Sequence, residues 1–322
     1  FTTTQAGHIP VVVTRDREGA LRAFVNVCRH RAYMIAQGNG CRETLQCAYH
    51  AWTYELDGSL RRAPRSEREE GFDRADFSLL PVSVDTWGPF LFVNPAADAT
   101  PLAETLGDLP QIVASSGLDL ATLKFHSHTS WEIEANWKVA LENYLECYHC
   151  PTAHPGFSKV IDVDPDSYAL TVSPTFSSQI GPVRASALSG DGRAPYVPRG
   201  DVTSSQYHFI WPNTTINIAP GPQNISLERW VPDGTGRTIE VTDYWFGEGL
   251  ADDVIDEFLA FWSARPEVEK ILISLYTPQI GEVSAERLLP ADRTRVVRNL
   301  RLVEDDVEHG GRGGDRKIGM ME

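Results

Sequence analysis

Two cysteines and two histidines occur as two Cys/His pairs, Cys28-x-His30 and Cys47-x2-His50, with sixteen residues between the pairs. In a Rieske [2Fe-2S] cluster two thiolates hold one iron and two imidazoles hold the other, and two mixed pairs on adjacent loops would supply these ligands. Zinc could use the same side chains, but zinc sites usually separate Cys-x2-4-Cys from His-x3-5-His. The spacing therefore predicts a Rieske cluster, with structural zinc as the alternative.

Short strands and tight turns are expected to position these four side chains. Alternating apolar and aromatic residues predict strands at residues 24–27 and 52–54. The dipeptides Asn39-Gly40 and Asp57-Gly58 are typical of type I′ hairpin turns. We therefore expect both ligand loops to hang from hairpins, and we expect Cys41, which lies between the two pairs, not to be a ligand.

A second set of metal ligands is predicted by Glu146-x2-His149-x4-His154. Residues 137–148 lack Gly and Pro and follow Asn136, a favourable N-cap, so we predict a helix there. Glu146 and His149 would lie one turn apart on it, with His154 just past its end. Two imidazoles with a remote carboxylate as third ligand leave coordination positions open and suit a non-haem Fe(II) centre. A solvated helix carboxylate is the alternative for Glu146.

The same segment contains Cys147 and Cys150, whose spacing is that of half a zinc site. With His149 and His154 they could bind zinc. Thiolates would change the chemistry of a ferrous centre. We therefore interpret both cysteines as small buried hydrophobic residues on the predicted helix.

The chain resembles the alpha subunits of Rieske non-haem iron ring-hydroxylating oxygenases in the segments NVCRHRAYMIAQGNG, LQCAYHAWTYELDGSL and NWKVALENYLECYHCPTAHPGF. The resemblance implies that an acidic residue, here Glu146, links the two metal centres. Many members have Asp at this position, whereas Glu is similar to the branch acting on carnitine, choline or betaines. By the same resemblance the [2Fe-2S] ligands are Cys28, His30, Cys47 and His50, and the mononuclear iron ligands include His149 and His154.

The third iron ligand of this family is acidic and lies on a late helix, a position that aligns with Glu269. Pro266 and Thr277-Pro278 interrupt the region where the family would continue helically. Asp305 or Asp306 is the alternative, because it matches the longer spacing of the ring dioxygenases. All of these could also be ordinary surface charges.

The resemblance also implies an activity and partners. Electrons from NAD(P)H would arrive through a separate flavin/iron-sulfur reductase, pass through His50, Glu146 and His149, and support O2-dependent hydroxylation or oxidative demethylation of a small organic substrate. The family architecture implies a homotrimer. Aromatic ring dioxygenation is the alternative reaction. An iron-sulfur electron-transfer protein with a degenerate iron site is the alternative of another class.

Composition narrows the remaining function classes. The 322 residues include 44 acidic and 29 basic ones, a net charge of -15, which argues against a nucleic-acid partner. No apolar run is long enough to span a membrane. Five cysteines do not make a disulfide framework, so we expect a cytoplasmic protein. The first residue is Phe, and we expect the N-terminus to be truncated.

The predicted fold class is α+β, with an all-β Rieske domain followed by an antiparallel sheet and helices around the iron site. We predict the first domain at residues 1–98, the catalytic domain at 99–308 and a disordered tail at 309–322. Within the catalytic domain residues 125–135 alternate as a half-buried strand, on which His126 and His128 would be solvated.

Aromatic residues gather in the predicted strands of the catalytic domain. Tyr244 and Phe246 should share one face, opposite Trp245. Such residues usually build a core, although an aromatic pocket could also hold a quaternary ammonium by cation-π contact. The full set is Trp211, Trp230, Tyr244, Trp245 and Phe246.

Overall fold

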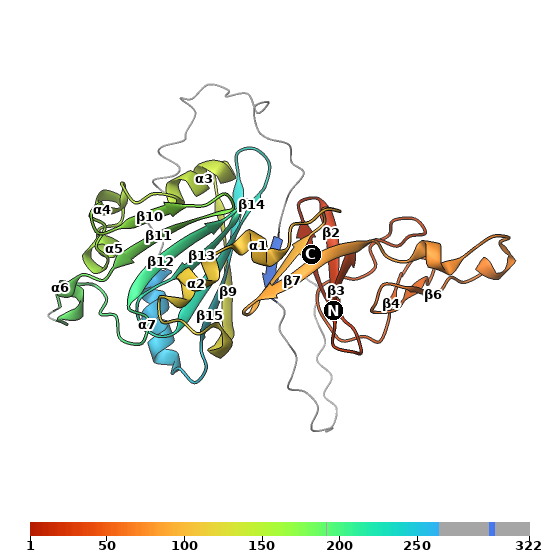
Figure 1. The fold of residues 1–322 in the computed structure, drawn as a ribbon, viewed down its shortest axis with the longest axis horizontal. Helices are drawn as coiled ribbons and strands as arrows, with labels where there is room; N and C mark the ends of the chain where they lie inside the picture. Colours follow the sequence, from red (N-terminus) through yellow and green to blue (C-terminus); the bar gives the residue numbers. More distant parts are fainter. Residues whose placement is uncertain (191, 264–295, 300–322) are drawn as a thin grey trace, which may run out of the picture.

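The chain folds into two β-rich halves that lie next to each other along the long axis of the molecule (Figure 1). The computed structural model describes residues 1–190 and 192–263 and the backbone of residues 296–299. Strands dominate the first half, and an antiparallel sheet with helices forms the second. The predicted α+β class is confirmed.

The N-terminal half consists of two antiparallel sheets in the described residues. Its larger sheet has the order β1-β2-β3-β7-β8-β16, and its smaller sheet has the order β4-β5-β6. Two short 3-10 helices follow β6, at Ser66–Arg68 and Arg74–Phe77. The strands are β1 (Thr2–Ala6), β2 (Ile9–Arg15), β3 (Leu21–Val25), β4 (Leu45–Gln46), β5 (Thr53–Tyr54), β6 (Leu60–Arg62), β7 (Pro81–Trp87), β8 (Phe90–Asn94) and β16 (Val296–Asn299).

Strand β2 has a core on each face. Val11 and Val13 pack with residues of β7 and β8, while Val12 points to the opposite side. There it joins a cluster that includes Cys28 and Cys47. A period-two strand can serve two cores only if both faces are covered, which explains the unbroken valine run.

The type I′ turn predicted at Asn39-Gly40 is wrong. That turn needs positive φ at both central residues, and Asn39 does not have it. Asn39 instead bridges to Thr2, and the Gly40 N–H donates to the Phe1 carbonyl at 2.9 Å. Pairing with a segment far away in sequence therefore decides the conformation here.

Asp57-Gly58 does form the hairpin turn between β5 and β6, but not the predicted type. Only Gly58 has positive φ, at 87°. Its N–H donates to the Glu55 carbonyl at 3.0 Å, and Asp57 Oδ1 accepts from the Ser59 N–H at 2.9 Å. A Cβ on Gly58 would lie 2.4 Å from the Phe24 ring, so only glycine fits.

The C-terminal half is built on a seven-stranded antiparallel sheet, in the described residues, with the order β10-β11-β12-β13-β14-β15-β9. Its strands are β9 (Leu123–Ile133), β10 (Ala169–Val172), β11 (Phe176–Pro182), β12 (Ser204–Ile210), β13 (Thr214–Ile218), β14 (Asn224–Pro232) and β15 (Thr238–Gly247). Its helices are α1 (Leu102–Leu106), α2 (Leu109–Ala114), the 3-10 helix Leu120–Thr122, α3 (Trp137–Tyr144), α4 (Cys150–Ala153), α5 (Pro155–Val160), α6 (Ala185–Leu188) and α7 (Asp252–Trp262).

The two faces of this sheet have different neighbours. One face buries Leu227 and Trp245 against α1, α2 and β8, and the Phe90 and Trp245 rings are 5.0 Å apart. Tyr244 and Phe246 lie in a separate cluster with α7. The prediction that these two share a face opposite Trp245 is confirmed, because side chains alternate along a strand.

Edge strands of the two larger sheets bear on other expectations. His126 and His128 are exposed on β9, an edge strand, as predicted. Strand β16 pairs with β8 and so adds residues 296–299 to the sheet of the N-terminal half. The split at residues 98 and 99 stays a prediction.

A buried histidine of β12 gives the fold a pH dependence. Burial lowers the pKa of His208 from 6.5 to about 4. Its Nε2 donates to Gln206 Oε1 at 3.0 Å, and its Nδ1 lies 2.8 Å from Ser178 Oγ, an arrangement that suits the neutral ring. Between pH 6.5 and 4 the unfolded chain therefore binds a proton that the native chain does not, and stability falls as the pH falls.

When the pH is lowered from 7 to 4.5, wild type should lose unfolding free energy that His208→Gln does not lose. The difference between the two proteins should change by on the order of 3 kcal/mol at most. Denaturant unfolding at a series of pH values measures it. His8→Gln, at an exposed position in the turn between β1 and β2, is the control and should follow wild type. Parallel stability curves for wild type and His208→Gln would contradict the assignment.

Candidate metal centres

The two predicted ligand loops share the same pattern of backbone hydrogen bonds, although the spacing between Cys and His is one residue longer in the second loop. In each loop the cysteine N–H donates to the carbonyl five residues later, and the cysteine carbonyl accepts from the N–H four residues later. These bonds are Cys28 to Tyr33 (2.8 Å), Ala32 to Cys28 (2.8 Å), Cys47 to Trp52 (2.8 Å) and Ala51 to Cys47 (3.0 Å). Each loop closes a short hairpin, as predicted, at the bridge Val27–Met34 and at the pair β4–β5.

The loops also share a residue with positive φ at the same place: Ala32 has φ of 54° and Ala51 has φ of 56°. Left-handed backbone is unfavourable for residues other than glycine, and it persists where surrounding contacts enforce it. The two loops are thus held in a matched, strained conformation, as expected when two segments must present side chains to one group.

The four predicted cluster residues lie together. Cys28 and Cys47 are buried, whereas His30 and His50 are exposed, and the two imidazole rings are 4.6 Å apart. Burial raises the pKa of the Cys28 thiol. Two sulfurs inside and two imidazoles at the surface fit a cluster whose histidine-bound iron faces outward.

One zinc ion fits this group less well. Within the described ranges no three His, Cys, Asp or Glu side chains are arranged to share one ion. A tetrahedral zinc would need all four on one centre, whereas each iron of a [2Fe-2S] cluster takes two protein ligands. The arrangement favours the cluster, and the exposed Cys41 takes no part.

Tyr54 contacts one of the cluster sulfurs. Its Oη lies 3.4 Å from Cys28 Sγ and accepts from the Arg29 N–H at 3.0 Å. Since the oxygen already accepts from Arg29, the hydroxyl proton can point to the sulfur. Hydrogen bonds to cluster sulfurs raise the reduction potential.

We expect Tyr54→Phe to lower the Rieske reduction potential by about 40 mV, the equivalent of about 1 kcal/mol for one electron. An EPR-monitored redox titration measures the change. Tyr33→Phe, at an exposed tyrosine of the same half, is the control and should leave the potential within error of wild type. An unchanged potential in Tyr54→Phe would show that the hydroxyl does not bond the sulfur.

The helix predicted to carry the second centre is shorter than expected. Helix α3 ends at Tyr144, so Glu146 and His149 lie outside it. The Tyr144 carbonyl accepts from the Gln179 side chain at 2.5 Å, and the Tyr148 N–H donates to the Glu146 carboxylate. In a helix that continued through Tyr148 these two groups would bond each other, and both are already used.

The side chains of Glu146 and His149 are nevertheless in contact, as their spacing predicts. His149 Nδ1 donates to Glu146 Oε1 at 2.6 Å, which leaves Nε2 available to a metal. His154, between α4 and α5, brings its ring to 5.1 Å from that of His149. The two imidazoles and the supporting carboxylate thus fit an iron site. The candidates for its third ligand, Glu269, Asp305 and Asp306, lie outside the described residues.

Cys147 and Cys150 form a disulfide, which corrects their interpretation as free hydrophobic residues on a helix. Both are buried, but neither lies in α3. The pair closes a short loop that contains His149 and directly follows Glu146. With its sulfurs bonded to each other, the pair offers no thiolates, so the zinc alternative with His149 and His154 is not supported.

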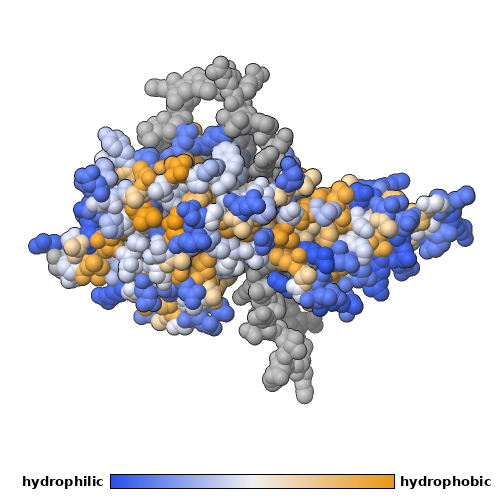
Figure 2. All heavy atoms as spheres, in the orientation of Figure 1, coloured by the Kyte–Doolittle hydropathy of each residue, from blue (hydrophilic) through white to orange (hydrophobic). Residues whose placement is uncertain are grey.

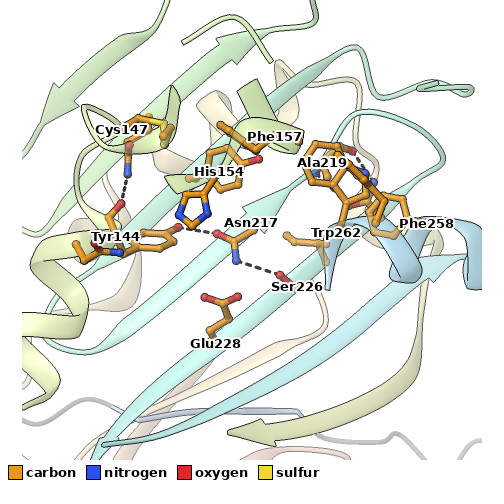
Figure 3. Close-up of a pocket in the computed structure, with 18 of the residues that line it drawn as sticks. Tyr144, Cys147, His154, Phe157, Asn217, Ala219, Ser226, Glu228, Phe258 and Trp262 are labelled. Atoms are coloured by element: carbon orange, nitrogen blue, oxygen red, sulfur yellow. Dashed lines mark hydrogen bonds between the residues drawn. A yellow bond between two sulfur atoms is a disulfide. The ribbon is translucent and has the colours of Figure 1, made fainter. Parts of the chain in front are cut away.

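A cavity of about 470 Å³ opens beside the two histidines. Ten of the described residues that line it are aromatic, and none is Lys or Arg. Figure 3 shows His154 above the cavity, with Tyr144 and Asn217 next to it and Glu228 below. The Tyr144 hydroxyl donates to Asn217 Oδ1 at 2.6 Å, and Asn217 Nδ2 donates to Ser226 Oγ at 3.1 Å.

The sequence interpretation missed Glu228, Tyr144 and Asn217. Burial, and secondly the negative charge of Glu228, raise the pKa of Tyr144 well above its usual value. A glutamate next to Leu227 in a segment with strand-like residues, ISLERWV, could have drawn attention to that strand. Its orientation toward the cavity, however, depends on the pairing of β13, β14 and β15.

Comparisons with known proteins find matches to both halves of the chain. The family model for the Rieske [2Fe-2S] domain matches residues 1–84, and that for the ring hydroxylating alpha subunit (catalytic domain) matches residues 120–270. The oxygenase subunit of carnitine monooxygenase from Acinetobacter pittii (strain PHEA-2) is 34% identical over 250 residues, which cover 76% of this chain and 65% of that protein.

Two further relatives are similar. The chloroplastic choline monooxygenase of Arabidopsis thaliana is 32% identical over 79% of this chain and 60% of its own length. The crystal structure of the quaternary ammonium Rieske monooxygenase CntA with an inhibitor superimposes with a TM-score of 0.71 and 30% identity, over 85% of this chain and 73% of that one. The chain therefore spans slightly less than two thirds of the curated relatives it matches.

Proposed function

Because the chain belongs to the ring-hydroxylating alpha subunits that carry a Rieske [2Fe-2S] domain, we propose that it is the terminal component of an oxygenase. It would use O2, with electrons from NAD(P)H delivered by a separate flavin/iron-sulfur reductase. The substrate would be a small quaternary ammonium compound, which is hydroxylated or oxidatively demethylated.

The cavity beside His149 and His154 carries this proposal. Its described wall combines ten aromatic residues with the carboxylates of Glu146 and Glu228 and contains no Lys or Arg. Aromatic faces and negative charge attract a quaternary ammonium, whose methyl groups need no hydrogen-bond partner. A neutral aromatic substrate would gain nothing from the buried carboxylate, which makes ring dioxygenation the weaker candidate.

The proposed roles of the site residues follow from their geometry. Glu146 holds the Nδ1 proton of His149, so that the ring presents Nε2 to the iron. When bound, the cluster supplies single electrons and the ferrous ion supplies O2 activation. The proposed cluster ligands are Cys28, His30, Cys47 and His50, and the proposed iron ligands are His149, His154 and Glu269.

The two centres lie far from each other within one chain. Strand β4, which leads into the second cluster loop, lies toward one end of the molecule, and α3 and α4 lie toward the other (Figure 1). We therefore propose that electrons pass to the iron of a neighbouring copy, as they would in a homotrimer. A structure of the related CntA enzyme is described in terms of inter-subunit electron transfer.

Exposed aromatic residues mark the surfaces that such copies would join. Tyr49 is 57% exposed, and its ring lies 3.9 Å from that of His50. Tyr148, two residues after Glu146, is 96% exposed. Apolar areas also appear on the face of the C-terminal half shown in Figure 2.

The expected compartment is the cytoplasm, where NAD(P)H and the reductase would be available. No helix in the part of the chain that the structure describes is both long and apolar enough to cross a membrane.

Reconstitution tests the proposal. The protein would be supplied with a reductase and NADH, and O2 uptake and products would be measured with choline, L-carnitine and naphthalene. About three irons per chain with turnover of a quaternary ammonium supports the proposal. Turnover of naphthalene alone would instead establish the ring dioxygenase, and two irons with a Rieske EPR signal and no turnover would establish an electron-transfer protein.

A further inference from the structure

We propose that Glu228 is the anionic contact for the cationic head of the substrate, and that it selects a charged ammonium over a neutral molecule of the same shape. This inference rests on the proposed function and assigns a specificity-determining residue to it. Glu228 lies on β14, is only 3% exposed and lines the cavity beside His154. Figure 3 shows its carboxylate directed into the space below His154 and Asn217.

Two hydrogen bonds in series fix the Glu228 carboxylate in place. The Trp230 indole N–H donates to Thr215 Oγ1 at 3.0 Å, and that hydroxyl donates to Glu228 Oε2 at 2.8 Å. Since the Thr215 oxygen accepts from Trp230, its own proton is directed to the carboxylate. The negative charge is therefore preorganised rather than carried on a mobile side chain, which lowers the cost of ordering it on binding.

The field of this carboxylate reaches the tyrosines of the cavity wall. Burial comes first in raising the pKa of both Tyr144 and Tyr207, and the charge of Glu228 adds to the shift at each. A cation placed among these rings would be attracted by the same charge and by the ring faces. An uncharged group of equal size would receive only the apolar contacts.

Glu146, the other carboxylate that lines the cavity, has a different role. Glu146 accepts from His149 Nδ1 and from the Tyr148 N–H, so its oxygens serve the metal site and the turn. Its side chain is also 44% exposed, where solvent screens its charge. Glu228, buried and facing the cavity, is the carboxylate suited to substrate recognition.

The chain offers a matched control in Glu240. This residue is likewise a buried glutamate, with 0% exposure, and its Oε1 accepts from the Thr242 hydroxyl at 3.0 Å. It sits on β15, opposite Trp230 in the strand register, but it does not line the cavity. Glu228→Gln and Glu240→Gln therefore remove the same charge inside and outside the proposed site.

The test compares choline with 3,3-dimethyl-1-butanol, in which a carbon replaces the ammonium nitrogen. Dissociation constants would be measured by calorimetry on the metal-loaded enzyme without reductase, for wild type, Glu228→Gln, Glu228→Asp and Glu240→Gln. Wild type should prefer choline by about tenfold or more, and Glu228→Gln should reduce that preference to about threefold or less through weaker choline binding. Glu240→Gln should keep the wild-type preference, and Glu228→Asp should restore much of it.

Iron content and the Rieske EPR signal, unchanged in all variants, would show that the fold and both metal sites are intact. If Glu228→Gln retains the wild-type preference for choline, Glu228 is a structural carboxylate and the inference is wrong, while the proposed substrate class stands. If wild type binds the neutral alcohol as well as it binds choline, and the same calorimetry gives no tighter binding of tetramethylammonium or L-carnitine, the quaternary ammonium proposal itself fails.

Discussion

Glu146→Gln is expected to keep both metal centres and to lose about a hundredfold or more of its turnover. In the native site the carboxylate accepts two hydrogen bonds, from His149 Nδ1 and from the Tyr148 N–H. Each bond goes to a different carboxylate oxygen, so in a glutamine one of the two N–H groups would face the NH2 group instead of an acceptor. Either the His149 ring loses its orienting partner or the turn after α3 loses its closing bond, and the negative charge between the proposed centres disappears in both cases.

Stopped-flow measurement of cluster reoxidation separates this effect from metal loss. The reduced enzyme would be mixed with substrate and O2, while iron content and the Rieske EPR signal are recorded on the same samples. Glu142→Gln, which removes an exposed carboxylate from α3, should reoxidise at the wild-type rate. Normal reoxidation and turnover in Glu146→Gln would rule out its bridging role.

Features set by neighbouring residues in the sequence could be predicted from it. The two Cys/His pairs lie on hairpin loops because spacing and flanking strand residues are local information. The alternation of Tyr244, Trp245 and Phe246 between two faces follows from the period of a strand. The contact between Glu146 and His149 was also predicted, although the helix expected to provide it is absent at these residues.

Features set by distant residues could not be predicted in the same way. Helix α3 ends where Gln179, 35 residues away in sequence, takes the Tyr144 carbonyl. Asn39 departs from its expected turn because it pairs with Thr2. The spacing Cys147-x2-Cys150 allows a free pair, half a zinc site or the observed disulfide, and only the path of the chain decides among them. Glu228 faces the cavity because of strand register, which local patterns do not fix.

Glu269→Ala is expected to remove the mononuclear iron and abolish turnover while leaving the Rieske cluster intact. The described residues supply two imidazoles, His149 and His154, and a non-haem iron oxygenase site of this type needs a carboxylate as well. Glu269 falls within residues 120–270, which the catalytic-domain family model matches, whereas Asp305 and Asp306 fall beyond that match. This difference favours Glu269 as the third ligand.

Metal analysis distinguishes the candidates. Wild type should hold about three irons per chain and Glu269→Ala about two. The iron affinity of the mononuclear site should fall by more than about a hundredfold. Loss of a residue that only hydrogen-bonds a ligand lowers metal affinity by about 10–100-fold, and loss of a direct ligand should lower it further. Glu267→Ala, two residues away, controls for a general effect of losing a carboxylate in this segment. If the iron instead disappears in the double variant Asp305→Ala/Asp306→Ala and stays in Glu269→Ala, the longer spacing of the ring dioxygenases applies. Retention of three irons in every variant would mean that the two histidines bind iron with a different third ligand.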